Sequence, residues 1–281
     1  MSSRLPTPDD YDEIYRQRTC ITILDNISAQ VVNDPTITKL NCTGFLGPGD
    51  REHYRDLLDS SISERRPGTL LDLGCGMALL GLWLAEQLGL DFVGVDFSSV
   101  AISLALGATS RRTIRKRFVT ASFESTGLPN NSVAAVFSLD ALYLASDPAA
   151  ALWEARRVMK QGAPLLFTYF VDSETKNDWP QLVQTAGFDI RSIANISNSW
   201  RQYMQEKHSC RWKHRRRIMK ELGYRAEAEL SVSASMLGLG GNRPYISSTF
   251  RYLLHAVSPM TAAHSVKRAT DSKTLYRTIV R

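Results

Sequence analysis

The sequence predicts an α/β fold built on a doubly wound, mostly parallel sheet. From residue 69 onward, short apolar runs alternate with segments of helical periodicity, the pattern of successive β-α-β units. Two of these runs end in a carboxylate, at Asp72 and at Asp96, and the first continues into the turn Gly74-Cys75-Gly76. In such sheets ligands bind at the carboxyl ends of the strands, so we expect a site at that edge.

Each element of the core has its own local signal. Apolar, β-branched runs predict strands, and apolar residues at helical spacing predict helices. Ser98 directly follows the second acidic strand end and is a suitable N-cap for the next helix. The alternating segment Tyr245–Val257 predicts a final strand at an edge of the sheet. The core strands are expected at Leu70–Leu73, Phe92–Val95, Phe118–Thr120, Val133–Leu139, Pro164–Phe170 and Ile190–Ile196, and the helices at Leu79–Leu88, Ser98–Ala108, Ala149–Met159 and Trp179–Ala186.

These elements divide the chain into five segments. Residues 1–61, which open with a helix near Pro8, form a predicted N-terminal helical cap, and residues 62–197 form the α/β core. Residues 198–243 are a helical insertion between strands six and seven, with helices at Trp200–Leu222 and Arg225–Leu237 separated by Gly223. Because the insertion follows strand six at the ligand edge, we interpret it as a lid. Residues 244–258 hold the last strand, and residues 259–281 are expected to be a disordered tail.

Composition limits the class of protein. The 281 residues are 43% hydrophobic and 22% charged, which is ordinary for a globular protein. No apolar run approaches the ~18 residues that span a bilayer, and the first eighteen residues lack the apolar stretch of a signal peptide. The four cysteines have no metal-ligand spacing. We therefore expect a cytoplasmic protein with no membrane contact and no metal site.

The glycine turn favours a cationic nucleoside ligand. A dinucleotide turn has the order G-x-G-x-x-G, but the third position here is Leu79. Asp72, before the first glycine, would also repel a phosphate, whereas it suits the sulfonium and ammonium groups of S-adenosylmethionine (SAM). The pattern Asp72-x-Gly74-x-Gly76 resembles motif I of the class I SAM-dependent methyltransferases.

The resemblance continues along the chain. Val119–Pro129 looks like the third-strand end that flanks the adenine, and Val133–Tyr143 looks like the fourth strand and its functional tip. Ala149–Phe170 is similar to the helix, turn and fifth strand that follow. The small-molecule branch, which includes ubiquinone-biosynthesis and sarcosine-type methyltransferases, is the nearest in pattern. It implies a seven-stranded Rossmann-like sheet with an antiparallel last strand, and SAM as cofactor.

The resemblance also implies a set of cofactor residues. In two places this sequence departs from the family. Ala78 stands where a third glycine is usual, a mild change because alanine tolerates helical backbone angles. Ser122 stands where most relatives have an aspartate that accepts a hydrogen bond from the adenine amino group. A serine hydroxyl can still accept that bond, at a cost of roughly 1 kcal/mol. The predicted SAM-binding residues are Tyr15, Asp72, Gly74, Cys75, Gly76, Asp96, Phe97, Ser122, Phe123 and Ser138.

Methyl transfer needs positioning of the two reactants and, for a nucleophile that bears a proton, a base. Asp140 and Tyr143 lie at the tip of the fourth strand. Asp140 is the predicted base and Tyr143 is predicted to form a wall of the methyl-transfer site, although Asp140 could instead cap the turn that follows the strand. His208 in the insertion is a second candidate base. Aromatic and cationic side chains that suit a planar or anionic substrate complete the predicted site: Phe45, Trp200, Arg201 and Tyr203.

Three functions remain open from the sequence. We favour a methyltransferase of a small-molecule acceptor in biosynthesis. The net charge of +6 and the basic clusters Arg111–Arg117 and Arg211–Arg217 would suit an RNA methyltransferase. The Asn/Asp-Pro-Pro-Tyr motif of amino-methyltransferases that act on nucleic acids is absent, however, which makes nucleic acid the less favoured partner. The third is a non-catalytic SAM-fold partner subunit, which the intact Asp72 and Asp96 disfavour.

Overall fold

The computed structural model describes residues 7–18, 23–24, 26–27, 45–47, 49–62, 68–173, 176–239, 241 and 244–259. Apart from its first residue, the tail predicted to be disordered lies outside these ranges. Seven strands form a single sheet in the order β3-β2-β1-β4-β5-β7-β6, in which only β7 runs antiparallel to its neighbours. The strands are β1 (Thr69–Leu73), β2 (Asp91–Asp96), β3 (Lys116–Thr120), β4 (Ala135–Ser138), β5 (Pro164–Asp172), β6 (Asp189–Asn195) and β7 (Thr249–Val257). The prediction of a mostly parallel, seven-stranded Rossmann-like sheet is confirmed.

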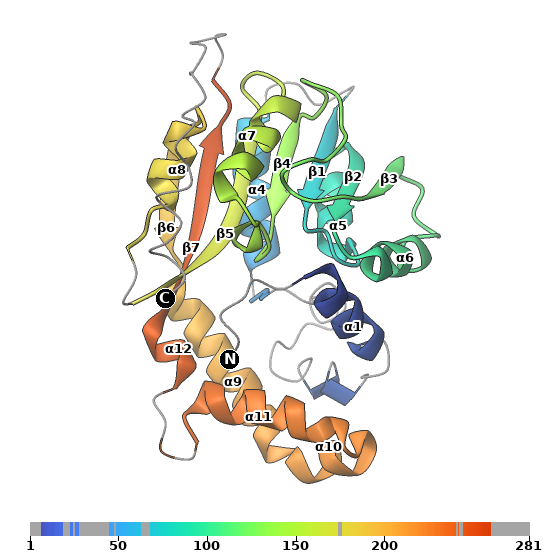
Figure 1. Cartoon of the computed structure of the whole chain (residues 1–281), viewed down its shortest axis with the longest axis vertical. Helices are drawn as coiled ribbons and strands as arrows, with labels where there is room; N and C mark the ends of the chain where they lie inside the picture. Colours follow the sequence, from blue (N-terminus) through green and yellow to red (C-terminus); the bar gives the residue numbers. More distant parts are fainter. Residues whose placement is uncertain are drawn as a thin grey trace.

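Helices cover both faces of the sheet (Figure 1). One apolar core lies under α4, α5 and α6, and the second lies under the short 3-10 helix η1 together with α7 and α8. Because the strands of the centre are buried on both faces, they read as continuous apolar runs. The helices are α1 (Pro8–Arg18), α4 (Asp50–Ser61), α5 (Leu79–Leu88), α6 (Ser99–Ala108), η1 (Leu142–Leu144), α7 (Pro148–Val158) and α8 (Trp179–Thr185).

The last strand differs from its prediction in two respects. The segment Tyr245–Ser248 forms the short helix α12, because the turn closes on Pro244, whose carbonyl accepts the Ser247 amide at 2.9 Å. The strand itself starts at Thr249 and lies between β5 and β6. It is therefore not at an edge, and its side chains, Arg251 included, are mostly buried.

The insertion forms three helices where two were predicted: α9 (Ser197–Lys213), α10 (Arg215–Leu222) and α11 (Arg225–Leu237). The additional break is at His214, whose backbone amide and ring Nδ1 both approach the Cys210 carbonyl, at 3.2 and 2.9 Å. The base of α9 belongs to the main core through Trp200, Tyr203 and Met204, and α10 lies at the end of the insertion farthest from the sheet (Figure 1).

The cap and the insertion pack on each other. Ile23, Leu24 and Ile27 form a third apolar cluster with Ile218 of α10 and Ala226 of α11. Nearer the sheet, α1 packs against α6. Both segments therefore lie beyond the carboxyl ends of the parallel strands, where Figure 1 shows α1 and the insertion below the sheet. None of the helices in the described part of the chain is long and apolar enough to cross a membrane.

The backbone at Ala78 corrects one expectation. Ala78 precedes α5 with φ of 59° and ψ of 14°, in the left-handed region that disfavours every residue with a Cβ. The expected helical angles are therefore wrong. Glycine would be the unstrained residue here, so the departure from the family pattern costs conformational energy at this position.

Candidate active site

The glycine turn lies where the strand order reverses, between β1 and β4, the position at which open α/β sheets bind ligands. Gly74 and Cys75 both donate backbone hydrogen bonds to the Val95 carbonyl, at 2.8 and 3.0 Å, which ties the turn to the end of β2. Gly74 has φ of 76°, and a Cβ there would lie 2.3 Å from Cβ of Ala141. Only glycine fits this turn.

Asp72 is a buried carboxyl group next to this turn. It is 4% exposed, and within the described residues its side chain has no hydrogen bond and no ion pair. The first turn of α5 lies against it, because a Cβ on Gly81 would come within 2.1 Å of Oδ2. Burial, and then the negative charge of Asp96, raises the pKa of Asp72 to about 8. A carboxyl group with these properties fits a ligand that brings a positive charge.

Asp96 ends β2 and organises the turn. Its carboxylate accepts the Gly76 amide at 2.8 Å and the Ser98 amide at 2.9 Å, and burial raises its pKa. Two carboxylate oxygens hold about four acceptor positions, so two remain for the hydroxyl groups of a ribose. Cys75, between the two glycines, is buried, and burial raises the pKa of its thiol.

Helix α1 is held over this side of the site. Asp12 accepts hydrogen bonds from the Ser98 and Ser99 hydroxyls and from the Val100 amide, at the start of α6. The Ser98 bond is the main cause of a lowered pKa of Asp12. Tyr11 packs on Phe97 with ring centroids 5.2 Å apart, while Tyr15 is buried at 3% exposure. Phe97 thus meets the cap directly, and Tyr15 lies within it.

Three further predicted cofactor residues, Phe123, Ser122 and Ser138, have defined surroundings. The ring of Phe123 lies against the glycine turn, 3.3 Å from the position that a Cβ on Gly74 would take. Ser122 is exposed and pairs with Ser125 in an isolated bridge. Ser138 donates its hydroxyl to the Leu73 carbonyl at 2.7 Å and accepts the Leu142 amide. Ser138 therefore joins the ends of β4 and β1.

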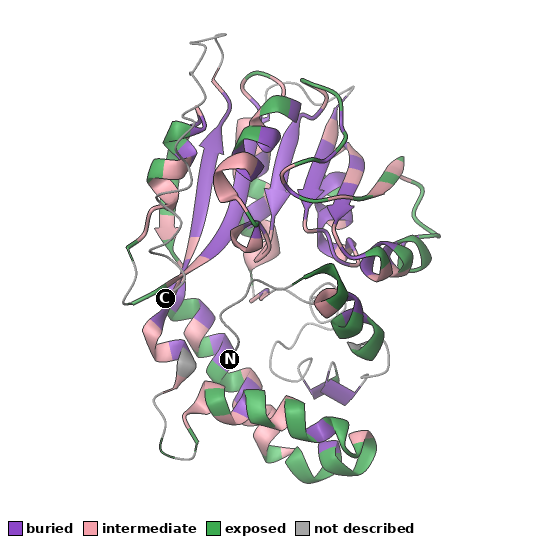
Figure 2. Cartoon of the chain, viewed as in Figure 1, coloured by how far each residue is buried: buried purple, intermediate pink, exposed green. Residues whose placement is uncertain are grey.

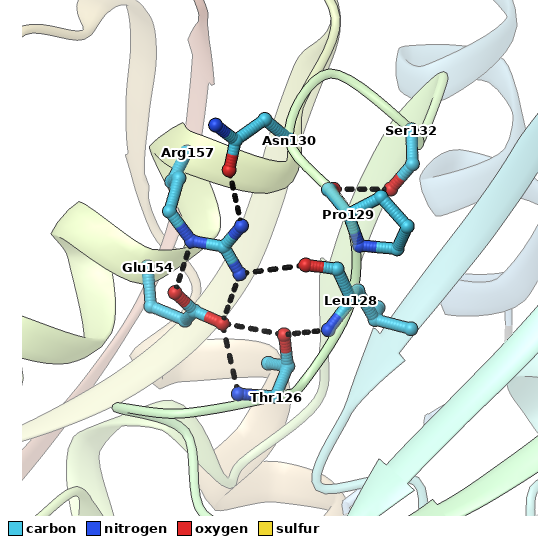
Figure 3. Close-up of polar contacts among 7 residues, drawn as sticks. All are labelled: Thr126, Leu128, Pro129, Asn130, Ser132, Glu154 and Arg157. Atoms are coloured by element: carbon cyan, nitrogen blue, oxygen red, sulfur yellow. Dashed lines mark hydrogen bonds and ion pairs between the residues drawn. The ribbon is translucent and has the colours of Figure 1, made fainter.

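The loop that carries Ser122 and Phe123 is anchored to α7 by a polar network (Figure 3). Glu154 accepts both the amide and the hydroxyl of Thr126, at 2.8 and 2.6 Å. Arg157 bonds Glu154 and also donates to the Leu128 carbonyl and to the Asn130 side chain. Although burial acts to raise the pKa of Glu154, these contacts hold it below its usual value. The network fixes the loop from outside the site.

We expect Arg157→Met to weaken SAM binding severalfold and to lower the free energy of unfolding by about 1–2 kcal/mol, because charge-assisted bonds to the loop are lost. Arg156→Met is the matched control: it removes the same group from the adjacent position, which lies outside the network. Titration calorimetry with SAM and urea denaturation would measure both quantities. Equal SAM affinity in the two variants would show that the network does not position the loop.

Asp140 does not have the surroundings of a free base. Its carboxylate accepts Arg251 Nε and Nη2, both at 3.0 Å, the Thr168 hydroxyl at 2.7 Å and the Phe45 amide at 2.8 Å. The side chains of Asp140 and Arg251 are 4% and 2% exposed. With every acceptor position taken by a donor, this carboxylate is a structural anchor between β4, β7 and the cap, and its surroundings do not support the predicted role of base.

Aromatic rings adjoin this anchor. Phe170, at the end of β5, contacts Tyr143, Phe45 and Trp200 with centroids 5.4, 5.8 and 5.2 Å apart, and Arg251 lies 5.8 Å from its ring centre. Phe45, Tyr143 and Phe170 are half-buried, whereas Trp200 is 3% exposed. The structure thus brings together three predicted residues, Tyr143, Phe45 and Trp200, around Phe170.

The other predicted insertion residues face elsewhere. Arg201 donates to the Ile246 and Thr249 carbonyls, at 2.8 and 2.9 Å, so it braces α9 against β7. His208 is 2% exposed, bonds Ser233 of α11, and has a pKa lowered to about 3 by burial and by Arg211 and Lys207. Tyr203 is buried beneath Lys207. None of these surroundings supports the predicted roles of Arg201, Tyr203 and His208.

Sequence reasoning missed four residues of the site: Arg251, Phe170, Asp12 and Gly81. Arg251 had a detectable signal, since an arginine inside an otherwise apolar strand requires a buried partner. Gly81 lies in the first turn after the glycine motif. Asp12 and Phe170 carried no local signal. Among the described residues, no cluster of three or more His, Cys, Asp or Glu side chains is arranged to hold a metal ion.

Comparison with known proteins agrees with this geometry. Residues 71–167 match the family model of the methyltransferase domain. Phosphoethanolamine N-methyltransferase of Triticum aestivum is 23% identical over 173 residues, 60% of this chain and 34% of that protein. The chain thus spans about a third of the length of the curated relatives it matches.

Two solved structures share the fold. Phosphoethanolamine N-methyltransferase 2 of Haemonchus contortus, in complex with SAM, superposes with a TM-score of 0.67 at 17% identity, over 84% of this chain and 56% of that one. The [4+2]-cyclase SpnF gives 0.61 at 23% identity, over 75% and 81%. Residues 71–167 of this chain thus match the methyltransferase-domain model, and the core shares the fold of these two structures.

Proposed function

We propose that this protein transfers a methyl group from SAM to a small-molecule acceptor. The observation that carries the proposal is the Asp72 carboxyl group: buried, without a partner among the described residues, and beside a turn that admits only glycine. Burying such a group without compensation is costly, and a cationic ligand would compensate it. A phosphate-bearing dinucleotide would not.

Each of three residues would contact a different part of the cofactor. Asp96 would accept the ribose hydroxyls, Asp72 would face the cationic end, and Phe123 would pack beside the adenine. When bound, SAM supplies a methyl group activated by a sulfonium. Transfer of this methyl group to an acceptor atom would break the carbon–sulfur bond and leave S-adenosylhomocysteine, and any proton displaced from the acceptor would pass to solvent.

The acceptor side is expected to be aromatic and without a free carboxylate. Phe45, Tyr143 and Phe170 offer half-buried rings, and the charge of Asp140 is neutralised by Arg251. This supports an acceptor with an apolar or planar body and catalysis through positioning and exclusion of water. The cap and the insertion, joined by their own apolar cluster, are suitably placed to act together as the lid.

The test is incubation of the purified protein with SAM and a fractionated small-metabolite extract, followed by mass spectrometry for a gain of one methyl group. We expect Asp96→Ala to weaken SAM binding by at least about tenfold, since hydrogen bonds to a charged acceptor contribute ~1.5–3 kcal/mol each. Asp91→Ala is the matched control: it lies at the other end of β2, in a solvent-exposed pair with Arg115 at 3.8 Å.

Two results would count against the proposal. SAM affinity unchanged by Asp96→Ala would remove the cofactor assignment. Tight SAM binding with no methylated product in any fraction would indicate that the fold serves another reaction or a non-catalytic role.

A further inference from the structure

The outer end of the insertion carries an apolar groove. A groove of about 510 Å³ lies where the end of α9 meets α10 and α11, lined by residues between 212 and 234 that include Trp212, Met219, Tyr224 and Leu230. Met219 is 58% exposed and Tyr224 is 84% exposed. Large apolar side chains grouped in this way mark an interaction site. We call residues 212–234 the insertion tip.

Cationic side chains lie over two aromatic rings that line this groove. Arg215 lies over the Trp212 ring at 5.6 Å, and Arg225 over the Tyr224 ring at 5.8 Å. Lys213, Arg215, Arg216 and Lys220 are exposed, and none of the four forms an ion pair with an acidic residue in the described ranges. Between residues 211 and 229, seven side chains are basic and three are acidic. The tip thus combines exposed apolar groups with excess positive charge.

The tip is separate from the proposed SAM site. Ile218 and Ala226 pack on the cap, and Ala226 also lines the groove, while most of the rest of α10 and α11 is exposed in Figure 2. SAM-site residues belong to the sheet edge, at the other end of the insertion (Figure 1). Neither cofactor binding nor the fold therefore accounts for the exposed Met219 and Tyr224.

We propose that the insertion tip docks on the surface of an anionic phospholipid bilayer. Helices with basic residues beside exposed apolar groups lie in the headgroup region, with the apolar groups inserted and the cations on anionic lipids. Arginine and lysine stems can cover apolar surface while their charges reach the headgroups. Met219 favours a lipid surface over RNA, because RNA offers phosphates and stacking bases and neither needs an exposed thioether side chain.

The experiment is sedimentation of the full chain with vesicles of phosphatidylcholine alone, or with about 30% phosphatidylserine. We expect binding only to the anionic vesicles, falling as salt rises. The variant Arg215→Glu/Arg216→Glu/Lys220→Glu should bind at least about tenfold more weakly, given the contribution of each cation near such a surface. Met219→Ser/Tyr224→Ser should also weaken binding while leaving the charge unchanged.

The matched control is Arg111→Glu/Arg115→Glu/Arg117→Glu, which makes the same change of charge in the other exposed basic cluster. It should bind vesicles as the parent protein does, and SAM affinity should be unchanged in the tip variants. Equal loss in the control and tip variants would overturn the proposal in favour of a general effect of net charge. Binding to a 20-nucleotide RNA but not to vesicles would also overturn it, as would a dimer in solution that Met219→Ser/Tyr224→Ser dissociates.

Discussion

Replacing Asp140 with alanine is expected to lower the free energy of unfolding by about 3–5 kcal/mol, because it leaves the buried guanidinium of Arg251 without its counter-ion. That guanidinium is 2% exposed. Although burial acts to lower the pKa of Arg251, Asp140 with Tyr54 and Asp50 raises it, so Arg251 stays charged. Urea denaturation at neutral pH would measure the loss.

Two further variants define what the pair contributes. Asp140→Leu/Arg251→Met removes both charges and should recover much of the stability lost by the single substitution. Asp56→Ala, in a solvent-exposed pair with Arg55, should change stability by less than about 1 kcal/mol. If Asp140→Asn folded with parental stability but turned over ~10²–10⁴-fold more slowly, Asp140 would be the base after all.

Asp72→Asn should stabilise the protein in the absence of ligand, and more so as pH rises. Below pH 3.8 the carboxyl group is protonated in both the folded and the unfolded chain, so it has no effect. Between 3.8 and the folded-state pKa of about 8, the unfolded chain loses the proton and the folded chain keeps it, so rising pH destabilises the parent. The asparagine variant lacks this loss, and its advantage at pH 8 should be on the order of 5 kcal/mol, because folding raises the pKa from 3.8 to about 8 and each pKa unit corresponds to ~1.4 kcal/mol.

The same substitution should weaken SAM binding by at least about tenfold, since an attraction between opposite charges is lost in a buried site. The substitution should also change the number of protons released when SAM binds. A cationic ligand lowers the pKa of Asp72, so the parent should release a proton when SAM binds at pH 7, and the variant should not. Calorimetry in buffers of different ionisation enthalpy would detect this. Identical pH profiles of stability in the two proteins would contradict the whole scheme.

The position of the glycine turn and its two carboxylates at the sheet edge was predictable because their signals are local. A strand, a turn that needs glycine and a carboxylate at the strand end follow one another within eight residues, and Asp72, Gly74, Gly76 and Asp96 could therefore be placed by reading along the chain. The layered sheet followed from the same alternation. Ala78 was misread because its left-handed backbone depends on how the turn meets α5.

The acceptor side was not predictable in this way, since its contacts join distant segments. Asp140 and Arg251 are 111 positions apart, and no pattern near Asp140 reveals its partner. Helical spacing placed Arg201, Tyr203 and His208 on α9, but it does not tell whether a given side of that helix meets substrate, α11 or β7. Tertiary packing decided these roles.

The apolar cluster between the cap and the insertion joins two segments that the ribosome synthesises far apart in time. Ile23, Leu24 and Ile27 pack on residues that are made roughly 190 positions later, Ile218 and Ala226. Until α10 and α11 leave the ribosome, these side chains lack the part of the cluster that the insertion supplies, although the strands of the sheet up to β6 are already complete. The nascent chain therefore exposes an apolar segment through most of translation, a state in which chaperones capture proteins and aggregation begins.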